Sequence, residues 1–164
     1  MNRLDIDNIN DRAPYDVAYD EDDEIIFLTD YGISYYVTFD EEPNPYFTAY
    51  WFNLTNPRHI SSPSDKKIAQ TVICIIEEFF RQNPDILLYM CSTDGGQQAQ
   101  RSRLFLRWFN GAEQQKHYYI RATEVKGEEG MDYVACIVQR NNPHLDEIIE
   151  LFDSDITMFN EMKP

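Results

Sequence analysis

The fold is decided by one stretch of the chain, Ile86-Leu-Leu-Tyr-Met-Cys-Ser-Thr-Asp-Gly-Gly-Gln-Gln-Ala-Gln-Arg-Ser-Arg-Leu-Phe-Leu-Arg-Trp-Phe109. Its first six residues form an apolar run, which is typical of a strand buried on both faces. Thr93-Asp94-Gly95-Gly96 has the chemistry of a tight turn, because glycine adopts positive φ without strain. Residues 97–109 then carry apolar side chains at helical spacing. The stretch predicts a buried strand, a sharp turn and an amphipathic helix.

Upstream of this stretch, three β-rich runs and a helix are predicted. Residues 24–29 and 33–39 flank Asp30-Tyr31-Gly32, which suits a hairpin loop with glycine in the left-handed position. Residues 46–54 read as a third strand. A helix is expected over about residues 63–82 after a hydroxyl cap in Ser62-Pro63-Ser64-Asp65. Its apolar stripe consists of Ile68, Val72, Ile75, Ile76, Phe79 and Phe80.

Downstream, residues 116–125 and 132–139 are predicted strands, and Asn142-Pro143 opens a last helix. The residues after Ile156 are expected to add a short turn or to fray. The order β-β-β-α-β-α-β-β-α predicts an α+β domain: a mostly antiparallel sheet of about six strands with three helices. We expect one domain over residues 24–164. Residues 1–23 are expected to form an acidic, loosely ordered arm. The arm would dock through Leu4, Ile6, Ile9, Tyr15 and Val17.

The charge is unevenly distributed along the chain, whose net charge is −15. Residues 1–42 contain 13 acids and 2 bases, residues 143–164 contain 6 acids and 1 base, and the 100 residues between them contain 10 acids and 11 bases. This excess of acids argues against binding to nucleic acid or to an anionic membrane. A solvated surface is the favoured interpretation, and the alternatives are an acidic surface that recognises a basic partner and a mimic of nucleic acid.

The three cysteines indicate a reducing compartment. Cys74, Cys91 and Cys136 lie far apart inside apolar runs, which is typical of buried core thiols and not of a disulfide framework. The first residues lack the apolar segment of a secretory signal, and no apolar run is long enough to span a membrane. We therefore expect a cytoplasmic protein, of bacterial type.

The turn after residue 91 is the best candidate for a ligand site. Its free N–H groups at a helix start would favour an anion. The candidate anion-binding residues are Gly95, Gly96, Gln97, Arg103 and Arg107. A structural explanation is favoured over this one, because Asp94 can cap the helix and pair with Arg101, whose position falls on the apolar face of the helix. The P-loop pattern is missing.

The same residues carry a resemblance to a known family. Tyr89-Met-Cys-Ser-Thr-Asp94, Gln98, Arg101-Ser-Arg-Leu-Phe105 and Trp108-Phe109 resemble small bacterial domains of unknown function that are best represented in Bacteroidetes. Tyr31-Gly-Ile-Ser-Tyr35 and Asn142-Pro143 extend the resemblance over about residues 24–155. The resemblance implies a shared fold and no activity. The resemblance implies a basic residue just after the aspartate turn, whereas this chain has Gly96 near that position.

No catalytic constellation stands out. His59, His117 and His144 lack the spacing of metal ligands. Cys91 with His117 is a weak candidate for a nucleophile and its base, and Pro84-Asp85 with Glu124-Val125-Lys126 only mimics a nuclease pattern. We therefore expect no cofactor or metal. The sequence favours a binding or protein-interaction module whose partner is another protein or a second copy. The alternative is a domain, an enzyme included, that recognises a small anion or nucleotide through the residue 94–107 region.

Overall fold

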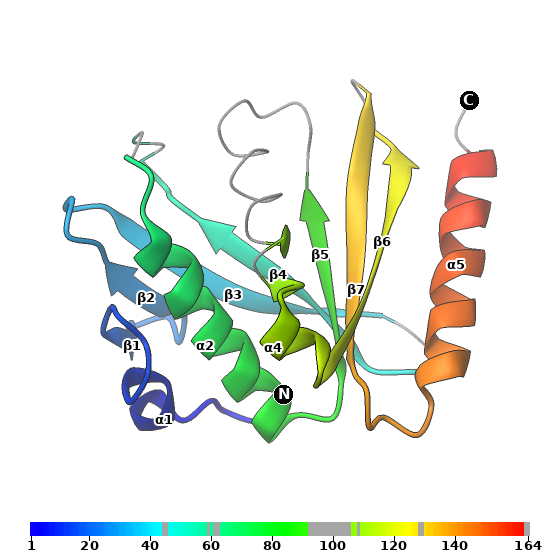
Figure 1. Ribbon diagram of the computed structural model, residues 1–164. Coiled ribbons are helices and arrows are strands. Elements are labelled where there is room, and N and C mark those ends of the chain that lie inside the picture. The colour runs from blue at the N-terminus through cyan, green and yellow to red at the C-terminus, as the bar shows by residue number, and fades with distance from the viewer. Residues whose placement is uncertain are drawn as a thin grey trace. The chain divides into compact units, whose positions relative to one another are not determined.

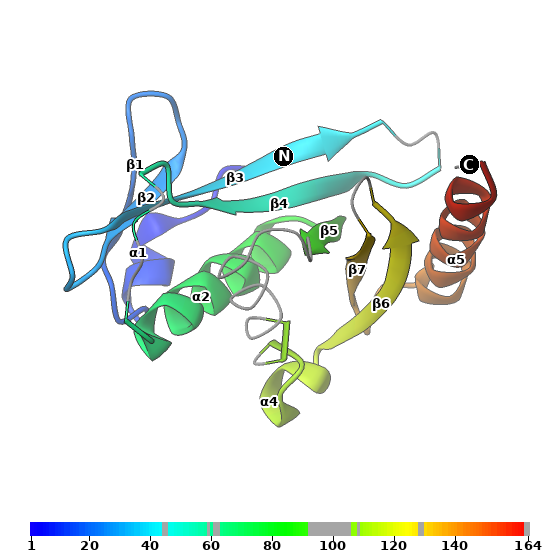
Figure 2. The ribbon, with the colours of Figure 1, turned by 90° about the horizontal axis from the view of Figure 1, so that it is seen from above.

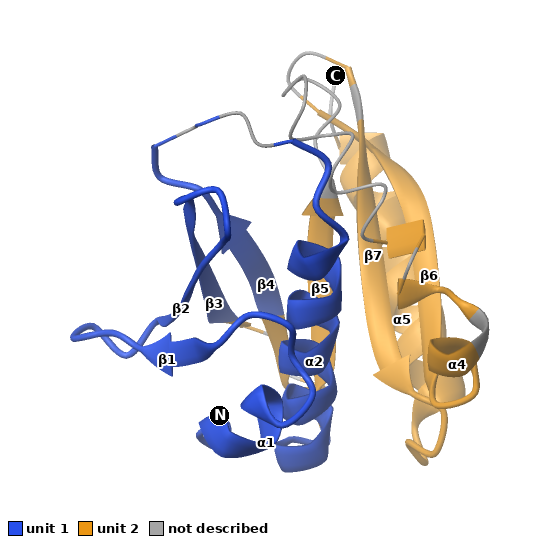
Figure 3. Cartoon of the chain, turned by 60° about the vertical axis from the view of Figure 1, so that its left-hand side comes forward, with its two compact units in different colours: residues 1–40, 51–84 blue, residues 41–50, 85–164 orange. Residues whose placement is uncertain are grey.

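The computed structural model describes residues 1–43, 46–58, 60, 63–91, 106–107, 109–127 and 130–162 (Figure 1). These residues form seven strands and four helices. The chain divides into two compact units, which Figure 3 shows in two colours. Unit 1 consists of residues 1–40 and 51–84, and unit 2 consists of residues 41–50 and 85–164.

Unit 1 is built on an antiparallel meander. Its elements are α1 (Ile6–Asn10), β1 (Val17–Tyr19), β2 (Ile25–Leu28), most of β3 (Ser34–Glu42) and of β4 (Ala49–Thr55), and α2 (Lys66–Gln82). The strands follow the order β1-β2-β3-β4, and β2 is antiparallel to both β1 and β3. The predicted hairpin loop between β2 and β3 is confirmed, because Gly32 has φ +74° and the Thr29 N–H donates to the Ile33 carbonyl at 2.9 Å.

Helix α2 covers this meander, as Figures 1 and 2 show from two directions. Its N-cap is Asp65, whose side chain accepts from the Lys67 N–H, and not one of the preceding hydroxyl residues. The Phe79 ring stacks on Phe39 at 5.0 Å. The helix is buried over a wide arc, and its buried residues are Ala69, Thr71, Val72, Ile75, Ile76, Glu78, Phe79 and Phe80.

The first 23 residues contain secondary structure. Asp5 caps α1 by accepting from the Asp7 and Asn8 N–H groups, and Asn10 bonds the backbone of Val17 through both atoms of its amide at 2.8 and 3.0 Å. Four of the five predicted docking residues are buried: Leu4, Ile9, Tyr15 and Val17. Residues 1–23 therefore include a short helix and a short strand, and the loosely ordered arm remains a prediction. The boundary proposed at residue 24 remains a prediction.

Unit 2 contains a three-stranded antiparallel arrangement. Its elements are β5 (Ile86–Cys91), α4 (Ala112–Gln115), β6 (Tyr118–Lys126), β7 (Met131–Gln139) and α5 (Leu145–Met162). The strand order is β5-β7-β6. The central strand β7 is buried from Val134 to Val138. In β5, Ile86, Leu87 and Tyr89 are buried but Met90 is 49% exposed, so the predicted burial on both faces holds only in part.

Helix α5 runs beside the outer strand β6 (Figure 1). The side-chain amide of Asn160 accepts from the Lys126 N–H at 2.9 Å and donates to the Glu124 carbonyl at 3.2 Å. Arg121 on β6 reaches α5 with two bonds to Asp153, at 3.1 and 3.3 Å. The amide of Asn160 thus occupies backbone groups that a further strand would use, which protects this end of the β6 edge.

The prediction of an α+β fold with a mostly antiparallel sheet is confirmed, but the predicted numbers of elements are wrong. The described residues form seven strands and four helices where six and three are predicted. The additional elements α1, β1 and α4 are five, three and four residues long, too short for a periodic pattern to show. Most of the predicted helix 97–109 lies outside the described residues. Its last turn is present, because the Asn110 N–H donates to the Leu106 carbonyl at 2.9 Å.

Candidate functional site

Most of the predicted anion site lies outside the described residues. This holds for Gly95, Gly96, Gln97 and Arg103, and for the structural pair of Asp94 and Arg101. Arg107 is described and exposed, and no ion pair joins it to an acid in the described part of the chain. Phe109 beside it is fully buried, with its ring 5.4 Å from that of Tyr118. The anion-binding hypothesis and the Asp94–Arg101 hypothesis remain predictions.

The strand register excludes both catalytic alternatives. Cys91 pairs with Tyr133, which pairs with Glu124 on β6, whereas His117 lies seven residues before Glu124. At about 3.3 Å per residue, His117 and Cys91 are roughly 20 Å apart along the strands. Asp85 is level with Tyr118 and therefore also roughly 20 Å from Glu124. Cys91 has no base in His117, and the two nuclease-like acids cannot share a metal ion.

A cluster of ionisable side chains in unit 1 is a second candidate site. The Tyr15 hydroxyl donates to Asp65 at 2.5 Å and accepts from the Asp30 N–H at 3.3 Å. The Lys67 ammonium bonds the Asp30 carboxylate at 2.8 Å and lies 5.4 Å from the centre of the Tyr15 ring. The Tyr15 N–H donates to the Thr71 hydroxyl at 3.3 Å. The cluster joins the β2–β3 loop, the segment before β1 and the start of α2.

The electrostatics of this cluster indicate a structural role. Burial and the bond to Asp65 raise the pKa of Tyr15 to about 12, so the phenol stays protonated near neutral pH. The bond to Asp30 raises the pKa of Lys67, which stays cationic. A general acid or base works best with a pKa close to the operating pH. Both shifts lead away from neutrality, and the hydrogen bonds of the cluster tie together three segments of unit 1.

Removing the Tyr15 hydroxyl is expected to remove a pH dependence of stability. The phenol pKa is 10 in the unfolded chain and about 12 in the fold, so its contribution is complete below pH 10 and is lost as the pH rises toward 12. Urea unfolding of wild type and of Tyr15→Phe at about pH 9 and about pH 11 tests this. The stability advantage of wild type over the variant should shrink at the higher pH. An advantage that is the same at both pH values would contradict the assignment.

The buried acid of α2 is also satisfied within unit 1. Glu78 is 0% exposed, and it accepts from Gln82 Nε2 at 2.7 Å and from the Asp5 N–H at 3.4 Å. It also pairs with Arg81. The sequence analysis missed this residue. One signal was available, because Glu78 lies three and seven residues after Ile75 and Thr71, which places it at the edge of the buried arc.

Four consecutive acids lie together on one turn of unit 1. Asp20, Glu21, Asp22 and Asp23 form the turn between β1 and β2, where Asp23 has φ +59°. Arg3 pairs with Asp23 at 3.0 Å, and its guanidinium lies 3.9 Å from the centre of the Tyr19 ring. One base therefore neutralises only part of this acidic turn.

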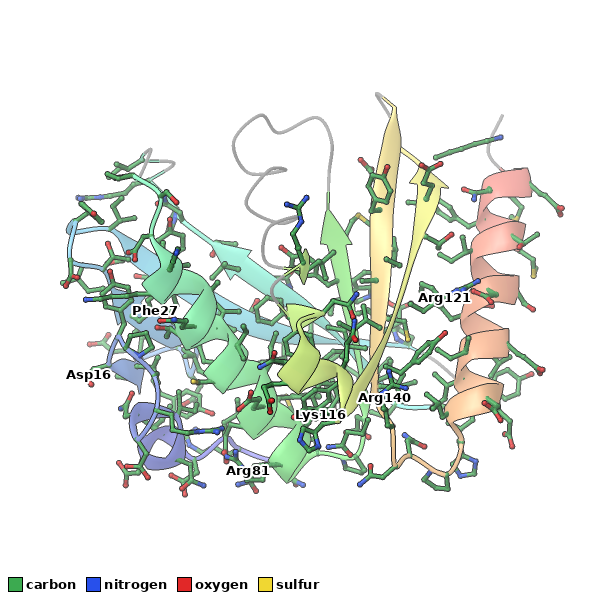
Figure 4. All side chains as sticks on the ribbon, viewed as in Figure 1. Asp16, Phe27, Arg81, Lys116, Arg121 and Arg140 are labelled. Atoms are coloured by element: carbon green, nitrogen blue, oxygen red, sulfur yellow. The ribbon has the colours of Figure 1, made fainter. Side chains whose placement is uncertain are left out.

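Helix α5 carries the most distinctive exposed surface in the described part of the chain. Met158, Phe159 and Met162 are 58%, 44% and 79% exposed, although they belong to an ordered helix. Only Ile148 and Phe152 of α5 are buried, and Figure 4 shows Arg121 extending toward this helix from β6. The sequence predicts a short turn or fraying after Ile156, so this surface was missed. The i, i+4 spacing of Met158 and Met162 places them on one face of a helix, but it does not show that this face is exposed.

A family model with the description "Family of unknown function (DUF6169)" matches residues 64–154. This is more than half of the 164-residue chain. The chain belongs to this family. Comparison with curated proteins and with solved structures gives no match. The resemblance to a family of unknown function is thereby confirmed in its general form, and it assigns no activity.

The DUF6169 match includes the predicted anion site but not the exposed methionines of α5. It includes α2, the predicted anion turn and the strands of unit 2, and it ends within α5 at Ser154. Met158 and Met162 follow the matched residues. In the described part of this DUF6169 protein, no helix is long and apolar enough to cross a membrane, and no group of three or more metal-ligating side chains is present.

Proposed function

We propose that this protein is a cytoplasmic bacterial module that binds another protein through helix α5. The observation that carries the proposal is the exposure of Met158 and Met162, at 58% and 79%, on an ordered helix. Large apolar side chains grouped on a surface are typical of sites that another molecule covers. Methionine suits such a site, because its flexible and polarisable side chain adapts to the shape of a partner.

The other features of the molecule support binding over catalysis. The Tyr15 cluster and Glu78 are engaged in bonds within unit 1. The acids on the β1–β2 turn and on α5 supply long-range attraction to a positively charged partner, which accelerates association. The small-anion alternative rests on the residue 94–107 region, of which Arg107 is the exposed described member.

A comparison of variants in a pull-down experiment tests the proposal. Met158→Gln with Met162→Gln makes the surface polar while keeping side-chain length and helix propensity. The matched control is Met90→Gln, which changes a 49% exposed methionine on β5. Wild type and the control should recover the same stoichiometric partner from native lysate, and the double variant should lose it. Equal recovery by all three proteins, or recovery of no stoichiometric partner, would refute the proposal.

A further inference from the structure

One face of α5 carries a stripe of two exposed methionines, an exposed aspartate and a half-buried leucine. Leu151, Asp155, Met158 and Met162 are spaced at intervals of four, three and four residues, which places them on one face of an α-helix. Leu151 is half-buried, Asp155 is exposed, and the exposure increases from Met158 to Met162. The stripe is therefore accessible along the C-terminal half of the helix.

This stripe borders the face that holds α5 on the strands. The holding face consists of the buried Ile148 and Phe152, together with Asp153 and Asn160, which bond to β6. At 100° per residue, Asp153 and Asn160 lie on the side of the helix opposite Met158 and Met162. A partner that contacts Met158 and Met162 from the side away from Ile148 therefore leaves the Asp153 and Asn160 bonds to β6 intact.

The charged side chains of α5 are all acidic. Between residues 145 and 162 the chain has six acids and neither lysine nor arginine. Glu161 lies on one side of the stripe and Asp155 borders Met162 on the other, and both are exposed. A second copy of this helix would bring like charges together, and an anionic membrane would also be repelled. The occupant that fits is apolar at its centre and basic at its margins.

We propose that this stripe binds a basic amphipathic helix of a partner protein. The proposal rests on the proposed function and adds the chemistry of the partner. Apolar residues of the partner, repeated at i, i+3, i+4 and i+7, cover Met158 and Met162. Lysines or arginines beside that apolar face pair with Asp155 and Glu161. The apolar contact supplies most of the affinity, and the charges select the partner and orient it.

The probe is a Leu/Lys peptide of about five helical turns with leucines on one face. One control peptide has the same composition in scrambled order, and another has glutamate in place of lysine. Binding to the full chain is measured by fluorescence anisotropy. The site is located by NMR of methionine methyl groups, since the protein has only five methionines. We expect the Leu/Lys peptide alone to bind, to shift the Met158 and Met162 signals, and to bind more weakly at about 0.5 M salt.

Variants connect this binding to the stripe. Met158→Gln with Met162→Gln should raise the Kd at least about tenfold, given the area that two buried methionines contribute. Asp155→Asn with Glu161→Gln should raise it about threefold, as expected for exposed ion pairs. Met90→Gln, far from the stripe in sequence, should leave it unchanged.

The outcomes distinguish this inference from the proposed function. Equal binding of the Leu/Glu and Leu/Lys peptides would overturn the basic partner and leave the binding surface in place. Binding that shifts neither methionine signal would overturn the location. Binding of zwitterionic vesicles through the stripe, or self-association that the methionine variants abolish, would replace the peptide partner with a membrane or a second copy. If no peptide bound, but the double variant still lost a partner in the pull-down, only the proposal of a basic amphipathic helix would be refuted. Failure of both experiments would refute both proposals.

Discussion

Replacing Glu78 by alanine is expected to lower the free energy of unfolding by about 2 kcal/mol, because a fully buried, hydrogen-bonded carboxylate is removed. Glu78 is 0% exposed and binds Arg81, Gln82 and the Asp5 N–H. Without the carboxylate, these donors lose their acceptor and a cavity remains beside α2. The N-terminal segment also loses one of the bonds that hold it to this helix.

The neighbouring Glu77 provides the matched control. Its side chain is 18% exposed and pairs with Arg12 at the surface, so Glu77→Ala should cost no more than about 1 kcal/mol. Urea unfolding can be followed through Trp51 fluorescence in a Trp108→Phe background, which leaves a single tryptophan in unit 1. Equal losses for the two alanine variants would show that Glu78 is not the acceptor that holds this segment.

Patterns that repeat within one element predicted the corresponding parts of the fold. The stripe of α2 and the glycine of the β2–β3 loop each reflect local chemistry. A helix follows Asn142-Pro143 as predicted, and the Asn142 side chain accepts from the His144 N–H at 2.9 Å just before α5 begins. Such features need no knowledge of distant residues, so sequence alone identifies them.

Other features depend on partners that are distant in the sequence. Strand β1 is three residues long inside an acidic segment and is defined by its pairing with β2. The buried Glu78 accepts from the N–H of Asp5, which lies more than 70 residues away. Asn160 fills the edge of β6 from 34 residues away. No periodicity within any one element encodes these contacts.

The two candidate surfaces, the turn after β5 and the exposed face of α5, differ in the same way. Local chemistry points to the first, and only the fold reveals the second. The turn after β5 attracts attention because glycine, aspartate and arginine have strong local preferences. The α5 surface has an ordinary amphipathic sequence, and its significance appears only when the strands are seen to bury Ile148 and Phe152 and leave Met158 and Met162 exposed. Exposure of an apolar side chain is a property of the whole fold, so sequence reasoning could not assign it.

Replacing Phe27 by alanine should have the largest effect of the substitutions considered, a loss of about 3–5 kcal/mol in the free energy of unfolding. The Phe27 ring is 2% exposed and lies between two others, 6.1 Å from Tyr15 and 5.5 Å from Tyr35. The loss combines the transfer of a large apolar side chain with the cavity that remains and with two stacked contacts. Because domains have only about 5–15 kcal/mol of stability, unit 1 would be close to unfolding.

Phe27 also supports the Tyr15 cluster, because its ring packs against the Tyr15 ring. Its partner Tyr15 holds Asp30 and Asp65, so the cavity should loosen the Tyr15 cluster as well. Phe27→Leu preserves most of the volume and should cost about 1 kcal/mol, and Phe159→Ala, at a 44% exposed ring, should cost less still. Urea midpoints measured with the Trp51 reporter for Phe27→Ala and Phe27→Leu test this order. If Phe27→Ala were no less stable than Phe27→Leu, the stacked rings of Tyr15, Phe27 and Tyr35 would not be the core of unit 1. Other contacts would then have to hold the acidic N-terminal elements in place.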